Sequence, residues 1–465
     1  MTADPTANLT ADLTAALAGF AAGTTADLPE PVRERIAVHT VDALTATVVG
    51  AAMPWTAAVR GYAVEESAPG PSSAVGTARR LRPELAALVT ATAAHGMEID
   101  DYALPALSHP GCVVVPVALA VAEDVGAGPA EVTAALAAGF ETALRIAEAV
   151  TPSLTSDRAF HVTSAIGVLA AAATAGRLHR LPPPVMAHAL GLAAAHAGGT
   201  AEFSRTGGDV KRAHAGFAAA AGIRAVRLAG HGLTAPRRAL DGERGFLTAF
   251  SAGVGAAARE RLADRLGVEW RTAALAVKAY CACAGLQAPI AAAEALRADG
   301  WRAADVDRLV VGLDRATLAH VGTIGPRPPD LTAAQLSAHH AVATRLVLGG
   351  NDPRHLRRTP PEVTALAERV DVELDPLAEE LFPHRLVASL RLRARDGRQV
   401  ALAVEAPGSP GRPLDRAAVT AKAARLAGPL IGADGTAALV AAADALDVPA
   451  VAAVLRGVPA RPGQE

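Results

Sequence analysis

Ionisable side chains gather at the starts of three predicted helices in the first half of the chain. The groups concerned are Asp100, Asp101, Tyr102 and His109 before the first helix, His161 at the second, and Lys211, Arg212 and His214 at the third. A helix N-terminus offers unpaired N–H groups and a partial positive charge, so it attracts carboxylates. If the three starts converge, their imidazole and ammonium groups can bind a di- or tricarboxylic acid and move protons on it.

Each of these residues, taken singly, also has an ordinary structural interpretation. A lone histidine is commonly a surface residue or a satisfied core residue. Asp100 and Asp101 could simply cap the helix that follows. Lys211 is less easily explained this way, because a lysine at a helix start faces a charge of its own sign. The hypothesis therefore rests on convergence, which predicts one shared carboxylate-binding site.

Motifs of other chemistries are missing from the sequence. It contains no Walker loop, dinucleotide-binding glycine fingerprint, nucleophile elbow or HExxH. Cys281 and Cys283 lack the second pair of a zinc site, so we interpret them as structural thiols. His339 and His340 are adjacent, and adjacent positions on a helix face different ways. We therefore predict a site with no metal and no cofactor.

The elements that must position these groups are mostly helices. From residue 8 to about 265, helical periodicity recurs in stretches such as "CVVVPVALAVAEDV", "VTSAIGVLAAAATAGRLHRL" and "HAGFAAAAGIRAVRLAG". After about residue 268 the pattern changes. A β-like run covers Arg308 to Leu313, the helix "AAQLSAHHAVATRLVLGG" follows, and "HRLVASLRLRARDGRQVALAVEAP" indicates a hairpin that turns at Arg395-Asp396-Gly397. From Asp415 the chain is helical again.

These patterns predict a mostly α fold with two domains. Residues 1–268 and 405–465 would form a large all-helical domain from both chain ends, and residues 269–404 an inserted, smaller α+β domain. A smaller domain joined by two crossings suits a lid over a cleft.

Composition limits the class of protein. The 44 basic and 46 acidic residues nearly cancel and form no long block of one sign, so we expect no nucleic-acid or membrane partner. Three cysteines cannot build a disulfide framework, and the acidic N-terminus does not resemble a secretory signal. We expect a soluble, cytoplasmic protein.

Several stretches together resemble the MmgE/PrpD family, which includes 2-methylcitrate dehydratase, cis-aconitate decarboxylase and iminodisuccinate epimerase. The most specific are "AAHGMEIDDYALPALSHPGCVVVPVALAVAE" and "TGGDVKRAHAGFAAAAGIRAVRLAGHGLTAPRRALDGERGFL"; "FHVTSAIGVLAAAATAGRL", "VKAYCACAGLQAPIAAA" and "SAHHAVATRLVLGG" extend the match over most of the chain. The resemblance implies a homodimer of two-domain subunits and cofactor-free lyase or isomerase chemistry at carbons next to carboxylates.

The resemblance also implies the roles of individual residues. The expected catalytic residues are His109, His161, Lys211, Asp101 and Lys278; the expected substrate-binding residues are Glu98, Asp100, Tyr102, Arg212 and His340. This sequence departs from the family pattern at several of the same places. Tyr102 stands where threonine is common, His340 where tyrosine is common, and Cys283 and Gln287 where histidine often follows the lysine.

The predicted chemistry is removal of a proton next to a carboxylate, by one imidazole, and delivery of a proton by the other. His109 and His161 would form this acid/base pair in unknown order, and Lys211 and Lys278 would hold substrate carboxylates. Dehydration of a hydroxylated di- or tricarboxylic acid is the leading prediction. Decarboxylation of a cis-aconitate-like acid, epimerisation of a dicarboxylate, and non-catalytic carboxylate binding are the alternatives.

Overall fold

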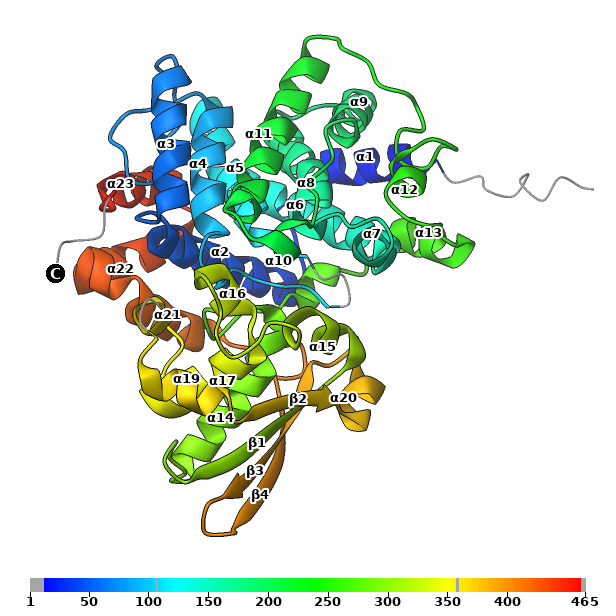
Figure 1. Cartoon of the computed structure of the whole chain (residues 1–465). Helices are drawn as coiled ribbons and strands as arrows, with labels where there is room; N and C mark the ends of the chain where they lie inside the picture. Colours follow the sequence, from blue (N-terminus) through cyan, green and yellow to red (C-terminus); the bar gives the residue numbers. More distant parts are fainter. Residues whose placement is uncertain (1–11, 105–107, 357–358, 461–465) are drawn as a thin grey trace, which may run out of the picture. The chain divides into compact units, whose positions relative to one another are not determined.

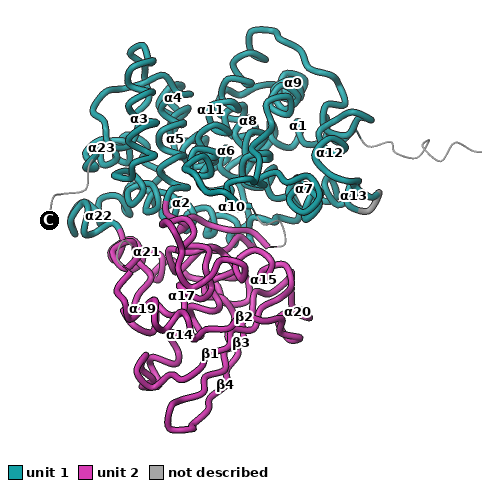
Figure 2. The backbone as a smooth tube through the Cα atoms, in the orientation of Figure 1, with its two compact units in different colours: residues 1–96, 106–273, 427–465 teal, residues 97–105, 274–426 magenta. Residues whose placement is uncertain are grey.

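The computed structural model describes residues 12–104, 108–356 and 359–460. It divides into two compact units (Figure 2): unit 1 comprises residues 1–96, 106–273 and 427–465, and unit 2 comprises residues 97–105 and 274–426. The start of the predicted N-terminal helix, at residues 8–11, and the polar tail at residues 461–465 lie outside the described residues. The prediction of a mostly α fold is confirmed.

Unit 1 is built from helices (Figure 1). They are α1 (Leu13–Gly23), α2 (Glu30–Gly50), α3 (Pro54–Glu66), α4 (Pro83–Ala94), α5 (Gly111–Val125), α6 (Pro129–Val150), α7 (Ser153–Ser156), α8 (Val162–Leu178), α9 (Pro183–Ala194), α10 (Phe203–Thr206), α11 (Val210–Gly230), α12 (Phe246–Ala249), α13 (Ala256–Ala263), α22 (Gly428–Ala445) and α23 (Val448–Gly457). The short 3-10 helix η1 (Arg271–Ala274) follows α13 in the chain.

Small side chains let the central helices of unit 1 pack closely. α8 packs against α5, α6 and α11, and α11 also packs against α4. A Cβ on Gly222 of α11 would lie 2.3 Å from the Cβ of Ala171 on α8, and a Cβ on Gly139 of α6 would lie 2.0 Å from Thr174 Oγ1. Alanine and glycine therefore set the short distances between these helices, which bring their ends close together.

No single helix within the described ranges is both long and apolar enough to cross a bilayer. The α2–α3 pair passes that test only when the two helices are taken together, and they are bent by 90° at their junction.

Unit 2 contains a four-stranded mixed sheet in the order β2-β1-β3-β4. The strands are β1 (Val306–Leu313), β2 (Val370–Leu374), β3 (Val387–Ala394) and β4 (Gln399–Glu405). β1 and β2 pair in parallel, whereas β1–β3 and β3–β4 are antiparallel. The predicted β-like run and the predicted hairpin are therefore confirmed, and Gly397 in the hairpin turn has a φ of 88°, which glycine tolerates. β2 was not predicted.

Helices surround this sheet in unit 2. They are η2 (Ala284–Leu286), α14 (Gln287–Ala298), α15 (Arg315–Val321), α16 (Leu331–Leu336), α17 (Ala338–Leu348), α18 (Pro353–Leu356), α19 (Pro361–Ala367), α20 (Pro376–Leu381) and α21 (Arg416–Leu426). α14 packs on β3 and β4. The sequence pattern over residues 333–350 predicted one helix, but the structure has two. Ser337 separates them because its hydroxyl accepts a hydrogen bond from the backbone N–H of His340 and caps α17.

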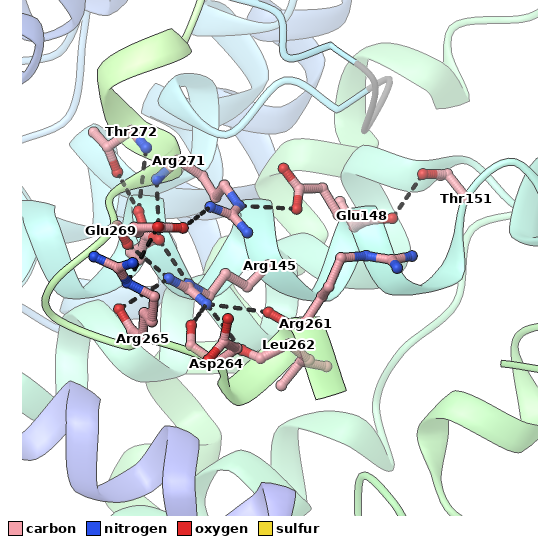
Figure 3. A network of polar contacts seen from close by, with 12 residues as sticks. Arg145, Glu148, Thr151, Arg261, Leu262, Asp264, Arg265, Glu269, Arg271 and Thr272 are labelled. Carbon is pink, nitrogen blue, oxygen red and sulfur yellow. Dashed lines mark hydrogen bonds and ion pairs between the residues drawn. The ribbon is translucent and has the colours of Figure 1, made fainter. Parts of the chain in front are cut away.

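A buried ion pair fastens the segment after α13 to α6 in unit 1 (Figure 3). Arg145 and Glu141, one turn apart on α6, are both fully buried and 2.8 Å apart. The Arg145 guanidinium also donates to the carbonyl oxygens of Asp264 at 2.5 Å and Glu269 at 2.6 Å. Glu141 accepts from the backbone N–H and the hydroxyl of Thr272. Every strong donor and acceptor here is satisfied by a partner from the other segment.

Replacing Arg145 with methionine should destabilise unit 1 strongly. The variant leaves Glu141 charged and buried and removes the donors from several carbonyl oxygens, a loss of about 3–5 kcal/mol in the free energy of unfolding. Urea unfolding of the full chain, followed by circular dichroism, measures this change. Arg261→Met on α13 is the matched control: Arg261 is exposed, and surface substitutions change stability by about 0.5 kcal/mol or less. Equal effects of the two substitutions would contradict the account.

Candidate active site

The starts of α5, α8 and α11 meet in unit 1. His109 lies just before α5, and its backbone N–H donates to Thr163 Oγ1 in the first turn of α8 at 3.2 Å. His161 is the N-cap residue of α8. His214 lies in the first turns of α11, and its Nδ1 is 3.1 Å from Nδ1 of His161. Three of the predicted polar segments therefore contact one another.

His95 lies between two of these segments, and sequence reasoning gave it no role. It caps the C-terminal end of α4 and its side chain is fully buried. Its ring centroid lies 5.5 Å from that of His109 and 5.4 Å from that of His161, and it stacks on His161 at 25°. A single histidine at the end of an apolar helix gives no signal by itself. Its place three residues before the acidic run that begins at Glu98 was the one available indication.

The His161–His214 pair is shielded by an aromatic side chain. The ring of Phe203 meets the ring of His161 edge-on at 5.3 Å and that of His214 at 5.7 Å. Burial, and then the nearby positive charge of Lys211, lower the pKa of His214 to about 4. His214 is therefore neutral at physiological pH.

The two basic residues at the start of α11 differ in their surroundings. Lys211 is only 5% exposed and is close enough to His214 to act on its pKa. Arg212 is fully buried, and its guanidinium carbon lies 5.2 Å from the centre of the Trp55 ring. A cation stacked on an indole is favourable. Trp55 therefore provides a structural reason for Arg212, next to the substrate contact that the resemblance implies.

In unit 2, Lys278 lies between two of the predicted acidic residues. Its Nζ is 2.9 Å from Oδ1 of Asp100 and 3.4 Å from Oε2 of Glu98. All three side chains are almost completely buried. Glu98 has a φ of 55°, an unusual backbone conformation for a residue with a side chain and one often found at functional sites.

The segment that carries these acids is tied to unit 2 by backbone contacts. Tyr102 forms an isolated β-bridge with Ala276, and Lys422 Nζ donates to the carbonyl oxygen of Ile99 at 2.7 Å. Asp101 is buried, 2% exposed. Tyr102 is buried as well, and burial raises the pKa of its hydroxyl, so this group is neutral at physiological pH.

The positions that depart from the family pattern have different roles in the structure. Gln287 accepts from the backbone N–H groups of Ala279 and Tyr280 and donates to the carbonyl oxygen of Ala282, so it holds the loop after Lys278. Burial would raise the pKa of the Cys283 thiol, but its hydrogen bond with His320 and the charge of that imidazole lower it to about 7.

His340 is fully buried on α17, and burial lowers its pKa. Among the described residues, neither of its ring nitrogens has a hydrogen-bond partner. Buried polar atoms are usually paired, so this imidazole is suited to a ligand or water.

The predicted residues thus form one group in each unit. In unit 1, His109 and His161 both contact His95, and Lys211 lies beside the His161–His214 pair. In unit 2, Glu98, Asp100 and Lys278 form a buried ion-pair cluster. The imidazoles of unit 1 can exchange protons near neutral pH, and Lys211 can hold an anion. The absence of a metal and of a cofactor stays a prediction.

Comparison with known proteins places these groups in context. A model of the MmgE/PrpD N-terminal domain matches residues 15–259, and a model of the MmgE/PrpD C-terminal domain matches residues 280–447. The cis-aconitate decarboxylase of Aspergillus terreus is 28% identical over 427 residues, which cover 87% of this chain and 86% of that protein.

Two further relatives carry related names. A cis-aconitate decarboxylase-like protein of Aspergillus oryzae is 30% identical over 70% of this chain and 71% of its own length. The human cis-aconitate decarboxylase is 34% identical over 36% of this chain and 35% of its own length. The N-terminal model alone covers more than half of the chain, and the pattern resemblance and the matched domains agree. This chain belongs to the MmgE/PrpD family.

Proposed function

We propose that this chain is a cofactor-free lyase that acts at a carbon next to a carboxylate of a di- or tricarboxylic acid. The observation that carries the proposal is the contact of two half-buried imidazoles, His109 and His161, with the same buried ring of His95. Lys211 supplies a positive charge in the same unit. Relatives named cis-aconitate decarboxylase that align over most of the chain support the lyase class.

Decarboxylation of a cis-aconitate-like acid is the first candidate reaction. The bond between carbon and one carboxylate breaks, carbon dioxide leaves, and the electron pair stays on carbon, where a neighbouring unsaturated carboxylate can delocalise it. An imidazolium then delivers one proton to carbon. One histidine of the His109–His161 pair acts as this acid, and Lys211 stabilises the charge that develops on the remaining carboxylate.

Dehydration of a hydroxylated di- or tricarboxylic acid is the second candidate, and the presence of two imidazoles favours it. One neutral imidazole takes the proton next to the carboxylate, and the other, protonated, gives a proton to the leaving hydroxide. Decarboxylation needs only the second of these steps. An epimerase would return the proton to the opposite face of the same carbon, and it too requires two groups.

The two lysines differ in their readiness to bind substrate. Lys278 already faces two carboxylates, Glu98 and Asp100, so a substrate carboxylate can bind there only if one of them is protonated or turns away. Lys211 lies beside neutral His214. We therefore assign Lys211 as the principal carboxylate-binding cation and Lys278 as the residue that orders the acids. From the family resemblance, we also propose a homodimer, which light scattering of the purified chain would test.

Reactions in deuterated water should distinguish the candidate activities. With cis-aconitate, the first candidate predicts release of carbon dioxide and a product with one carbon-bound deuterium. With a 2-methylcitrate-type acid, the second predicts formation of an alkene, whereas an epimerase predicts deuterium exchange without either. A thermal-shift screen across di- and tricarboxylates identifies ligands first. Binding without turnover of any acid would contradict the lyase proposal and indicate a carboxylate-binding protein.

Substitution of either proposed acid/base residue should slow turnover strongly. His109→Gln and His161→Gln each remove one proton-transfer group and should lower kcat by about 10²- to 10⁴-fold. Steady-state kinetics on the acid found above measure the loss, and circular dichroism checks folding. His196→Gln is the control because His196 is exposed and follows α9. Unchanged kcat in both site variants would exclude their proposed roles.

Loss of the charge of Lys211 should weaken catalysis more than folding. Lys211→Met keeps the length of a side chain that is almost completely buried but removes its ammonium group. We expect kcat/KM to fall by about 10²- to 10³-fold, the effect of removing one group that stabilises developing charge. Arg224→Met, at an exposed position of the same helix, is the matched control. If both variants keep the wild-type kcat/KM, Lys211 does not bind the substrate.

A further inference from the structure

His161 and His214 face each other through the same type of nitrogen. Their Nδ1 atoms are 3.1 Å apart, a hydrogen-bond distance. A hydrogen bond between two nitrogens requires one N–H donor and one lone pair. If both atoms carried a proton they would repel each other, and if neither did, two lone pairs would meet. One ring must therefore be the Nδ1–H donor and the other the Nδ1 acceptor.

The environment of His214 favours the acceptor role. His214 is 3% exposed, whereas His161 is half-buried. Burial and the charge of Lys211 disfavour a proton on His214 and lower its pKa to about 4. When His161 becomes an imidazolium, both its nitrogens carry protons. His214, still neutral, must then accept with Nδ1 and keep its own proton on Nε2.

An imidazole that repeatedly gains and loses a proton at Nε2 needs its other nitrogen to stay protonated. If His161 is the Nδ1–H donor, its Nε2 can accept and release a proton while the bond to His214 stays intact. If the roles were reversed, Nε2 of neutral His161 would already hold a proton. New protonation at Nδ1 would then place two N–H groups against each other. Only the first arrangement lets His161 work in both directions.

The surroundings hold the two rings in this orientation. The backbone N–H of His161 donates to the carbonyl oxygen of Gly199 at 2.8 Å. A Cβ on Gly199 would lie 2.3 Å from Ser164 Oγ and 3.4 Å from Cε1 of His214, and its φ of 97° also favours glycine. The groups that face the pair are the ring of His95, stacked on His161, the ring of Phe203, and the ammonium group of Lys211.

We infer that His214 is a positioning residue that accepts a hydrogen bond from Nδ1–H of His161 and so fixes Nε2 of His161 as the nitrogen that carries the proton during the reaction. This inference rests on the proposed acid/base role of His161. The arrangement serves the same purpose as the groups that orient metal-bound or catalytic histidines through their second ring nitrogen.

The tautomers can be measured without any substrate. Long-range ¹H–¹⁵N spectra of the full chain, labelled with ¹⁵N-histidine, distinguish Nδ1–H from Nε2–H rings, and His161→Gln and His214→Asn assign the two signals. At neutral pH we expect the Nδ1–H form for His161 and the Nε2–H form for His214. His214→Leu should return His161 to the Nε2–H form. His214→Asn should keep the Nδ1–H form, because the amide oxygen of asparagine can replace the accepting nitrogen.

Kinetics on the acid identified by the turnover screen provide the second readout. His214→Leu should lower kcat by about 10- to 100-fold, as loss of an orienting partner does, with little change in KM. His214→Asn should restore most of that loss. The acidic limb of the kcat/KM profile should move in His214→Leu and stay in place in His214→Asn, because the acceptor is lost only in the first.

The two readouts separate the possible failures. An Nε2–H form of wild-type His161, or an unchanged tautomer in His214→Leu, would overturn the inference whatever the activity. Equal loss of kcat in the leucine and asparagine variants would also overturn it, since a purely structural role does not depend on an acceptor atom. The expected tautomers in a chain that turns over no acid would support the inference about the pair and refute the proposed lyase function alone.

Discussion

The buried ring of His95 is the point on which the proposed chemistry of unit 1 physically depends. It ends α4, and it contacts the rings of His109 and His161, which belong to the starts of two other helices. Those starts can approach one another because alanine and glycine line the contacts between helices. A larger side chain at Gly222 or Gly139 would push α11 or α6 away from α8. The composition of the chain and the geometry of the site therefore have the same origin.

Burial gives charged and neutral groups different tasks in the two units. In unit 1, His214 pays the cost of burial by staying neutral, and Lys211 reinforces that state. In unit 2, Lys278 stays buried between Glu98 and Asp100, so charge is balanced by charge. The first arrangement suits proton transfer at His161, and the second suits the ordering of an acidic segment. Both follow from the rule that a buried ionisable group must be neutral or paired.

Much of the fold was predictable from the sequence, because local patterns decide it. Helical periodicity gave the mostly α fold, and Arg395-Asp396-Gly397 marked the hairpin between β3 and β4. β2 was missed since its five residues are identified as a strand only by parallel pairing with β1, a contact distant in sequence. The break between α16 and α17 depends on one capping serine. The lid role of residues 269–404 stays a prediction.

The candidate site was predictable only in part, for a similar reason. Helix starts with ionisable residues indicated His109, His161 and Lys211, because capping positions have a sequence signature. The role of His95 depends on two rings that come from distant segments, so no local pattern revealed it. The stacking of Arg212 on Trp55 likewise joins residues far apart in sequence. Contacts of this kind require coordinates.

A crystal structure of the chain with an unreactive, saturated tricarboxylate tests the central claim most directly. The account predicts one ligand carboxylate within about 3 Å, hydrogen-bond distance, of Lys211 Nζ, and the carbon next to a carboxylate facing an imidazole of His109 or His161. A ligand that competes with the substrate in solution but binds away from all three side chains would contradict it.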